Sequence, residues 1–182
     1  AVGIAQLDPL IAGDGDIAIA VVRDTEGTRL NTLDITTDEA QITATADLTS
    51  GASDARFDVA IRDINLVVPQ LNGPAVVTGT ALRGTDLITT FDIQATGPAT
   101  TLTANGTATP AEDGQSVAAT VAAQITDLDT FSELAGRDLG GAVDMDLSGV
   151  VLTQGLRIDV DLTAATTDLA VGIPQLDALL AG

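Results

Sequence analysis

Apolar and polar residues alternate in many short segments, and this two-residue period is the feature that most restricts the fold. In residues 143–148, Val, Met and Leu alternate with two Asp residues and a Ser. This pattern is typical of a half-buried β-strand, and the β-branched content of similar segments supports that interpretation. Further strands are predicted over 16–22, 41–49, 56–62, 90–96, 101–109, 116–126 and 156–163.

Short polar connections separate these segments. Asp24–Gly27, Ser50–Ser53 and Pro110–Gly114 each have the length and composition of a hairpin loop. Strands joined by such short loops must pair mostly antiparallel. Asn105–Gly106 is compatible either with a two-residue turn or with the interior of one longer strand.

Large side chains for a thick core are scarce. Aromatic residues make up 2% of the chain, whereas apolar residues make up 45%. The apolar side of each strand must still be covered, either by a second sheet in a sandwich or by curling of one sheet. No segment has the pattern of a long amphipathic helix. We therefore predict an all-β fold: an elongated, curled, taco-like, mainly antiparallel sheet with a hydrophobic groove and short helical turns between repeats.

A short sequence unit recurs along the chain. Residues 1–13 and 170–182 are near copies, and residues 61–73 and 125–136 are weaker ones. Repetition at intervals of tens of residues is typical of repeat arrays. We predict β repeats over 1–60, 61–124 and 125–169, with 170–182 beginning the next. Because the chain begins and ends within this pattern, we expect it to be a fragment of a longer chain.

Each copy of the unit reads as a capped helical turn. In residues 125–136, Thr130 and Glu133 are predicted to form a capping box, and Gly136 to end the helix. Asn65 is the predicted cap of the second copy. Asp8 and Asp177 are the predicted caps of the first and last copies.

The charge is strongly one-sided. The chain has 26 acidic and seven basic residues, a formal net charge of −19 and a mean hydropathy of +0.33. This balance argues against binding nucleic acid and against unassisted binding to an anionic membrane surface. The patterned apolar residues argue against disorder.

Several residue types that carry chemistry are absent from the sequence. The chain contains no His, no Cys and no Lys. This composition excludes His-based triads, thiolate nucleophiles, Cys/His zinc sites and Walker-type phosphate loops. We predict no catalytic residue, no cofactor and no metal site, and we expect the chain not to be an enzyme.

Two pairs of aspartates, Asp144 with Asp146 and Asp159 with Asp161, fall on single strand faces. They are interpreted as a solvated face that discourages edge-to-edge association, since no calcium-binding loop accompanies them. The alternative is a structural or adhesin-type β repeat with a closed core and calcium at these pairs.

The remaining candidate for function is the apolar side of the strands. It would be either a closed core or an open groove that holds an acyl chain or an apolar strand. The predicted groove lining consists of Leu48, Phe57, Val59, Ile61, Phe91, Ile93, Leu102, Val117, Val121, Val143, Met145, Leu147, Ile158, Val160 and Leu162.

Residues 125–141, ITDLDTFSELAGRDLGG, followed by the strand AVDMDLSG, resemble the "D-L-x-x-F-x-x-L-A-G-R-x-L-x-G" unit of the large AsmA-like family, and within it the TamB-like proteins. These are the inner-membrane subunits of the translocation and assembly module. Residues 6–13 fit the unit more loosely.

The resemblance implies a periplasmic β-sheet, part of an inner-membrane-anchored protein of a Gram-negative bacterium. It also implies a TamA-like outer-membrane barrel as partner. The implied cargo is phospholipid acyl chains, moved between the two membranes, or outer-membrane protein clients during their assembly. The family's working feature is the apolar lining as a whole, so no single functional residue carries over.

Overall fold

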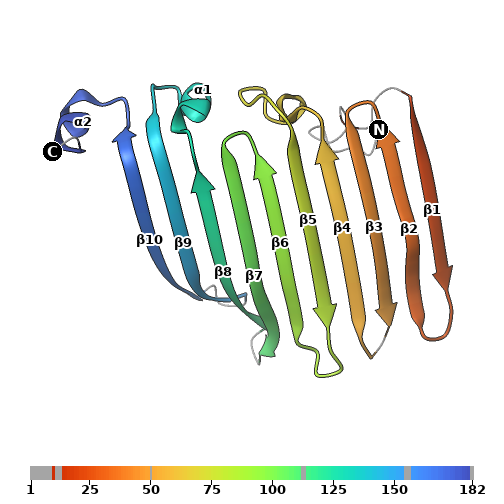
Figure 1. Cartoon of the computed structure of the whole chain (residues 1–182). Helices are drawn as coiled ribbons and strands as arrows, with labels where there is room; N and C mark the ends of the chain where they lie inside the picture. Colours follow the sequence, from red (N-terminus) through yellow and green to blue (C-terminus); the bar gives the residue numbers. More distant parts are fainter. Residues whose placement is uncertain (1–9, 11–13, 50, 112–113, 154–156, 181–182) are drawn as a thin grey trace.

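The computed structural model describes residues 10, 14–49, 51–111, 114–153 and 157–180. Ten strands account for most of this length (Figure 1). They are β1 (Gly15–Arg23), β2 (Gly27–Thr37), β3 (Ala40–Thr49), β4 (Ser53–Ile61), β5 (Ala75–Arg83), β6 (Thr89–Gly97), β7 (Thr100–Ala111), β8 (Gly114–Ile125), β9 (Gly140–Leu152) and β10 (Arg157–Ala170).

The strands form one sheet in chain order, and every strand pairs antiparallel with the next. Figure 1 shows them side by side as a single layer, with β1 and β10 at opposite edges. The sheet is curled and not closed. The predicted fold class, an elongated all-β antiparallel sheet with short helical turns, is confirmed.

This topology places connections of two kinds at opposite ends of the strands. The links β2–β3, β4–β5, β6–β7 and β8–β9 share one end, which we call the helical end. The links β1–β2, β3–β4, β5–β6, β7–β8 and β9–β10 share the other, which we call the hairpin end. The described copies of the repeated unit, at 61–73, 125–136 and 170–180, lie at the helical end, because each follows an even-numbered strand.

Short helices occupy three of these copies. They are η2 (Ile64–Leu66), the pair η3 (Leu128–Phe131) and α1 (Ser132–Ala135), and α2 (Pro174–Leu180). In Figure 1, α1 and α2 lie at the same end of the sheet, above β8 to β10. The first copy lies outside the described residues apart from Leu10, which is 3% exposed and accepts a hydrogen bond from Thr37 Oγ1 at 2.8 Å.

The predicted caps are wrong for the two central copies. Asp63, not Asn65, caps η2, and Asp127, not Thr130, caps η3. Each Asp accepts a hydrogen bond from the backbone N–H two residues further on, at 3.0 and 3.1 Å. Each Asp sits two residues after the end of a strand, so the turn begins there, earlier than the capping-box pattern indicates.

The predicted cap of the last copy, Asp177, is also wrong, whereas the predicted helix end at Gly136 is confirmed. Asp177 lies inside α2 and accepts a hydrogen bond from the N–H of Val171 at 2.7 Å. Gly136 ends α1 with a left-handed φ of 65°, as predicted. Asp8 lies outside the described residues.

Two strands, β2 and β5, are not among those predicted. In β2 the pairing shifts at Asn31 and Thr32, which together oppose single residues of both neighbours. This bulge places Leu30 and Leu33 on the same face although they are three residues apart, which breaks the two-residue period. Asn105 and Gly106 lie inside β7, which settles the open alternative in favour of one long strand.

Two phenylalanine rings compensate for glycines in neighbouring strands. A Cβ added to Gly79 would lie 2.4 Å from Cε1 of Phe57, its cross-strand partner. A Cβ added to Gly106 would lie 2.7 Å from Cζ of Phe91, again its partner. Each ring therefore lies across a position without a side chain, an arrangement known to stabilise strand glycines.

The sheet is continuous across the predicted repeat boundaries. β4 ends at Ile61, β8 at Ile125 and β10 at Ala170, close to the proposed starts of new repeats. At the first two of these points the next strand pairs directly with the one before it. The division into repeats stays a prediction.

Replacing Asp63 should destabilise the helical end in a pH-dependent way. The N–H groups of Gly73 and Asn65 both donate to its carboxylate at 3.0 Å, and these bonds hold the pKa of Asp63 below its ordinary value. A lowered pKa means that the stabilisation is complete above ~3.9, the usual Asp pKa, and is lost as the pH falls through the folded-state value.

We expect Asp63→Ala to unfold at a lower temperature than the unmodified chain at neutral pH, with the difference shrinking as the pH falls from about 4. Thermal unfolding followed by circular dichroism at several pH values measures this. Asp58→Ala, an exposed Asp for which no comparable turn contact exists, is the control. A difference that persists undiminished in acid would contradict the role of the ionised carboxylate.

Candidate apolar binding face

The strand registers align the apolar residues into three continuous rows on one face. The middle row consists of Ile19, Leu33, Ala44, Phe57, Gly79, Ile93, Ala104, Val121, Leu147 and Leu162. Toward the helical end lies the row of Ile17, Ile35, Ile42, Val59, Val77, Ala95, Leu102, Ala123, Met145 and Ala164. Toward the hairpin end lies the row of Val21, Leu30, Ala46, Ala55, Ala81, Phe91, Gly106, Ala119, Gly149 and Val160.

These three rows contain no polar side chain, and we call the surface they form the apolar face. With strands ~4.8 Å apart, the face extends about 43 Å across the sheet. Along the strands, the rows span about 13 Å, from the rise of ~3.3 Å per residue.

All fifteen residues of the predicted lining project from this side of the sheet. Ten belong to the three rows, as the lists show. The others lie in the rows that flank the apolar face on the same side: Ile61 and Val143 toward the helical end, and Leu48, Val117 and Ile158 toward the hairpin end. Phe91 and Val160 share a row, so residues 69 positions apart in sequence are brought into line.

No second layer of described residues covers the apolar face. Among the residues that the structure describes, the only fully buried apolar side chains are those of Leu10, Ala40 and Ala75, all at the helical end. On the face itself, Leu162 is 61% exposed, Ile19 61% and Phe57 39%. Most side chains on the central strands are half-buried, because they are shielded by neighbours in the same sheet.

The opposite face carries the negative charge. Cross-strand rows there contain Asp34 with Asp58, Asp47 with Asp54, and the Asp residues of β9 and β10, interspersed with Thr. Arg29 relieves part of this repulsion by pairing with Asp47 at 3.1 Å, Asp24 at 3.4 Å and Glu26 at 2.8 Å. Exposed apolar residues on this face, such as Leu82 and Val150, each lie beside an Asp in the neighbouring strand, so no continuous apolar row forms there.

The two aspartate pairs of β9 and β10 are offset from each other. Asp146 lies opposite Thr163, and Asp161 lies opposite Ser148. Asp144 accepts a hydrogen bond from Gln124 Nε2 at 2.8 Å. Among the residues that the structure describes, no three acidic groups converge as a metal site would require.

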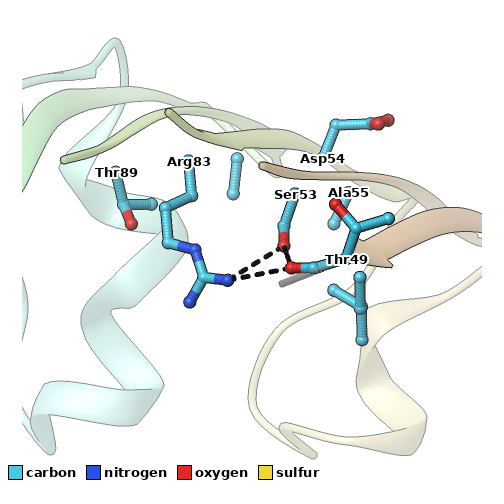
Figure 2. Close-up of a pocket in the computed structure, with 8 residues that line it drawn as sticks. Thr49, Ser53, Asp54, Ala55, Arg83 and Thr89 are labelled. Atoms are coloured by element: carbon cyan, nitrogen blue, oxygen red, sulfur yellow. Dashed lines mark hydrogen bonds between the residues drawn. The ribbon is translucent and has the colours of Figure 1, made fainter. Parts of the chain in front are cut away.

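A hollow of about 430 Å³ lies where the apolar face meets the hairpin end. Its apolar walls come from Leu48, Ala55 and Ala81, and the other lining residues are polar: Thr49, Ser53, Asp54, Arg83 and Thr89. Ser53, Arg83 and Thr89 are successive cross-strand partners in one row. Figure 2 shows the Arg83 guanidinium turned toward Ser53 and Thr49, with the Asp54 side chain directed away from it.

Comparisons of the chain with family models, with curated proteins and with solved structures find no match. Within the described part of the chain, no helix has the length and apolar character needed to cross a membrane.

Several residues of the apolar face are missing from the predicted lining. Those of β2 and β5 are missing because these strands were not predicted. Ile17, Ile19 and Val21 alternate with other residues within the predicted strand 16–22, but only the register with β2 places them on this face. Arg83 could be found only from the register, since nothing in its local sequence distinguishes it.

Truncation of an exposed leucine on this face should cost little stability. A buried Leu→Ala substitution destabilises by about 2–5 kcal/mol, but Leu162 remains 61% exposed. We expect Leu162→Ala to lower the free energy of unfolding by less than about 1 kcal/mol, because little area is lost. Leu147→Ala, at its half-buried partner in β9, should cost more.

Urea unfolding of both variants measures this difference. A loss of about 2 kcal/mol or more for Leu162→Ala would mean that this side chain is covered in solution, by another copy or another segment. That result would contradict an open apolar face.

Proposed function

We propose that this chain is a non-enzymatic segment of a periplasm-spanning, TamB-like protein whose apolar face carries or chaperones apolar cargo. The cargo would be phospholipid in transit between the inner and outer membranes, or strands of outer-membrane proteins during assembly. The observation that carries the proposal is the uninterrupted apolar face, left uncovered by the described residues.

The energetics favour a guest on this surface. Each methylene that moves from water onto an apolar surface contributes up to ~0.8 kcal/mol. An acyl chain is about 15 Å long, half of the ~30 Å hydrocarbon core of a bilayer. Laid across the strands, it occupies only part of the ~43 Å width of the apolar face. Laid along a strand, it slightly exceeds the ~13 Å that the three rows span and reaches the flanking rows.

The asymmetry of the sheet supports the same role. Acidic residues crowd one face, and the apolar residues occupy the other. An apolar guest therefore has only one side on which to bind, whereas the charged side keeps the elongated sheet soluble.

The setting of this activity is proposed from the sequence unit at residues 125–149. On this proposal the parent protein is anchored in the inner membrane of a Gram-negative bacterium and works with a TamA-like barrel in the outer membrane. Cargo would enter at one edge of the array of repeats and leave at the other, without any chemical reaction.

Two neighbouring substitutions on β10 test the proposed surface. Val160 is 46% exposed on the apolar face, whereas Asp161 projects from the opposite side. We expect Val160→Asp to reduce photo-crosslinking to a phospholipid with a photoactivatable acyl chain at least several-fold, because a carboxylate resists transfer into an apolar contact. Asp161→Asn should leave crosslinking unchanged.

A parallel reaction with a photoactivatable apolar β-strand peptide distinguishes the two cargo classes. If Val160→Asp and Asp161→Asn crosslink equally to both probes, the apolar face is not the binding surface.

A further inference from the structure

We propose that Arg83, together with Ser53, forms an anion-binding subsite at the hairpin end, and that it holds the phosphate headgroup of a phospholipid whose acyl chain lies on the apolar face. This inference rests on the proposed function, since it assigns the polar end of the cargo to particular residues. It also commits the cargo to lipid.

Arg83 lies on the side of the sheet that faces away from the acidic strand residues. Arg23, at the β1 end of the same row, lies on that side too. In the described strands, the acidic residues that take part in the registers project from the opposite face, apart from irregular strand ends. Arg29, Arg56 and most other strand charges are also there. Arg83 instead shares a row with Leu48, Ser53 and Thr89.

The contacts of Arg83 leave its charge uncompensated. Nη2 donates hydrogen bonds to the carbonyl oxygen of Thr49 at 3.3 Å and to Ser53 Oγ at 3.2 Å. Its Nε is buried without a hydrogen-bond partner. Among the described residues, no carboxylate lies within ion-pairing distance of Arg83, whereas Arg29 pairs with three.

The neutral contacts orient the guanidinium without neutralising it. A buried or half-buried donor without a partner is costly unless a ligand satisfies it. Arginine presents several donors in a planar fork that matches the oxygens of a phosphate, and such charge-assisted hydrogen bonds are stronger than neutral ones. Ser53 Oγ donates to the carbonyl oxygen of Thr49 at 3.3 Å while it accepts from Arg83, so Ser53 positions the guanidinium. Thr89 adds a hydroxyl group to the lining of the same hollow.

The hollow joins the headgroup subsite to the apolar rows. Its volume of about 430 Å³ falls within the ~300–1,000 Å³ range of small-molecule sites, and its walls are mainly apolar with a few polar groups. From Arg83 along β5, the next residues on this face are Ala81, Gly79 and Val77. Ala81 leaves space directly beside Arg83, and the Phe57 ring lies over Gly79 as an apolar surface beyond it. About 13 Å separates Arg83 from Gly79 along the strand.

The polar and apolar parts are therefore arranged as in a single-chain phospholipid. An apolar strand of a client protein would need no cation at this place, and a free phosphate would make no use of the adjoining apolar rows. The juxtaposition of an unpaired guanidinium with a continuous apolar surface favours an anionic lipid.

Titration calorimetry with two chain-matched lipids tests the subsite. The probes are lyso-myristoyl-phosphatidylglycerol, which is anionic, and monomyristin, which has the same acyl chain and no charge. We expect the unmodified chain to bind the anionic lipid more tightly, and Arg83→Gln to weaken that binding about tenfold, the loss expected for a charge-assisted hydrogen bond. Binding of monomyristin should not change.

Two further variants keep the test specific. Arg83→Lys retains the charge and should retain part of the preference for the anionic lipid. Arg56→Gln removes an exposed arginine from the opposite face and should change neither affinity. Circular dichroism verifies that each variant keeps its β-structure, and added salt should weaken binding of the anionic lipid only where Arg83 is present.

The outcomes separate this inference from the proposed function. If both lipids bind equally and Arg83→Gln has no effect, the subsite is overturned and the apolar face retains its proposed role. If Arg83→Gln weakens both lipids equally, Arg83 supports the structure of the face and does not hold a headgroup. If neither lipid binds but an apolar strand peptide does, the lipid assignment is overturned as a whole.

Discussion

The antiparallel ladder is the constraint on which the structure depends. Because each strand pairs with its successor, the register of one hairpin is transmitted to the next across all ten strands. A shift by one residue would send the apolar side chains of a strand to the acidic face. Gly79 and Gly106 fit only this register, since the phenylalanine ring of each one's cross-strand partner occupies the space where a Cβ would lie.

The consequence is a sheet with an unusual division of surface. In an ordinary domain, a second layer would cover the apolar side. Here the described residues leave that side exposed, and the helical turns close off only one end of it. Neighbouring strands thus satisfy one another's backbone hydrogen bonds. The apolar side chains have no such partner among the described residues and remain available to another molecule. The outer edges of β1 and β10 have backbone N–H and C=O groups without a strand partner in this sheet, so further strands could pair there.

Much of this architecture could be predicted from the alternation of residue types. Strands such as β8 and β9 have a strict two-residue period. From this period we predicted fifteen lining residues, and all of them project from the same side of the sheet. Prediction failed where the period is broken, as by the bulge at Asn31 and Thr32 in β2. It also failed for Arg83. The position of Arg83 beside the apolar face follows from its pairing with Ser53, and the pairing of segments 30 residues apart cannot be predicted from the residues around either one. The caps were misplaced because Asp63 and Asp127 follow the strand ends so closely that they look like part of the strands.

The central claim is that the apolar face receives a lipid or another apolar guest. Native mass spectrometry of the purified chain tests it most directly, under conditions that preserve noncovalent lipid adducts. The account predicts adducts with the mass of phospholipids in the unmodified chain, which diminish in Val160→Asp and persist in Asp161→Asn. A chain purified from cells without any lipid or peptide adduct, and unable to acquire one from added phospholipid, would contradict it.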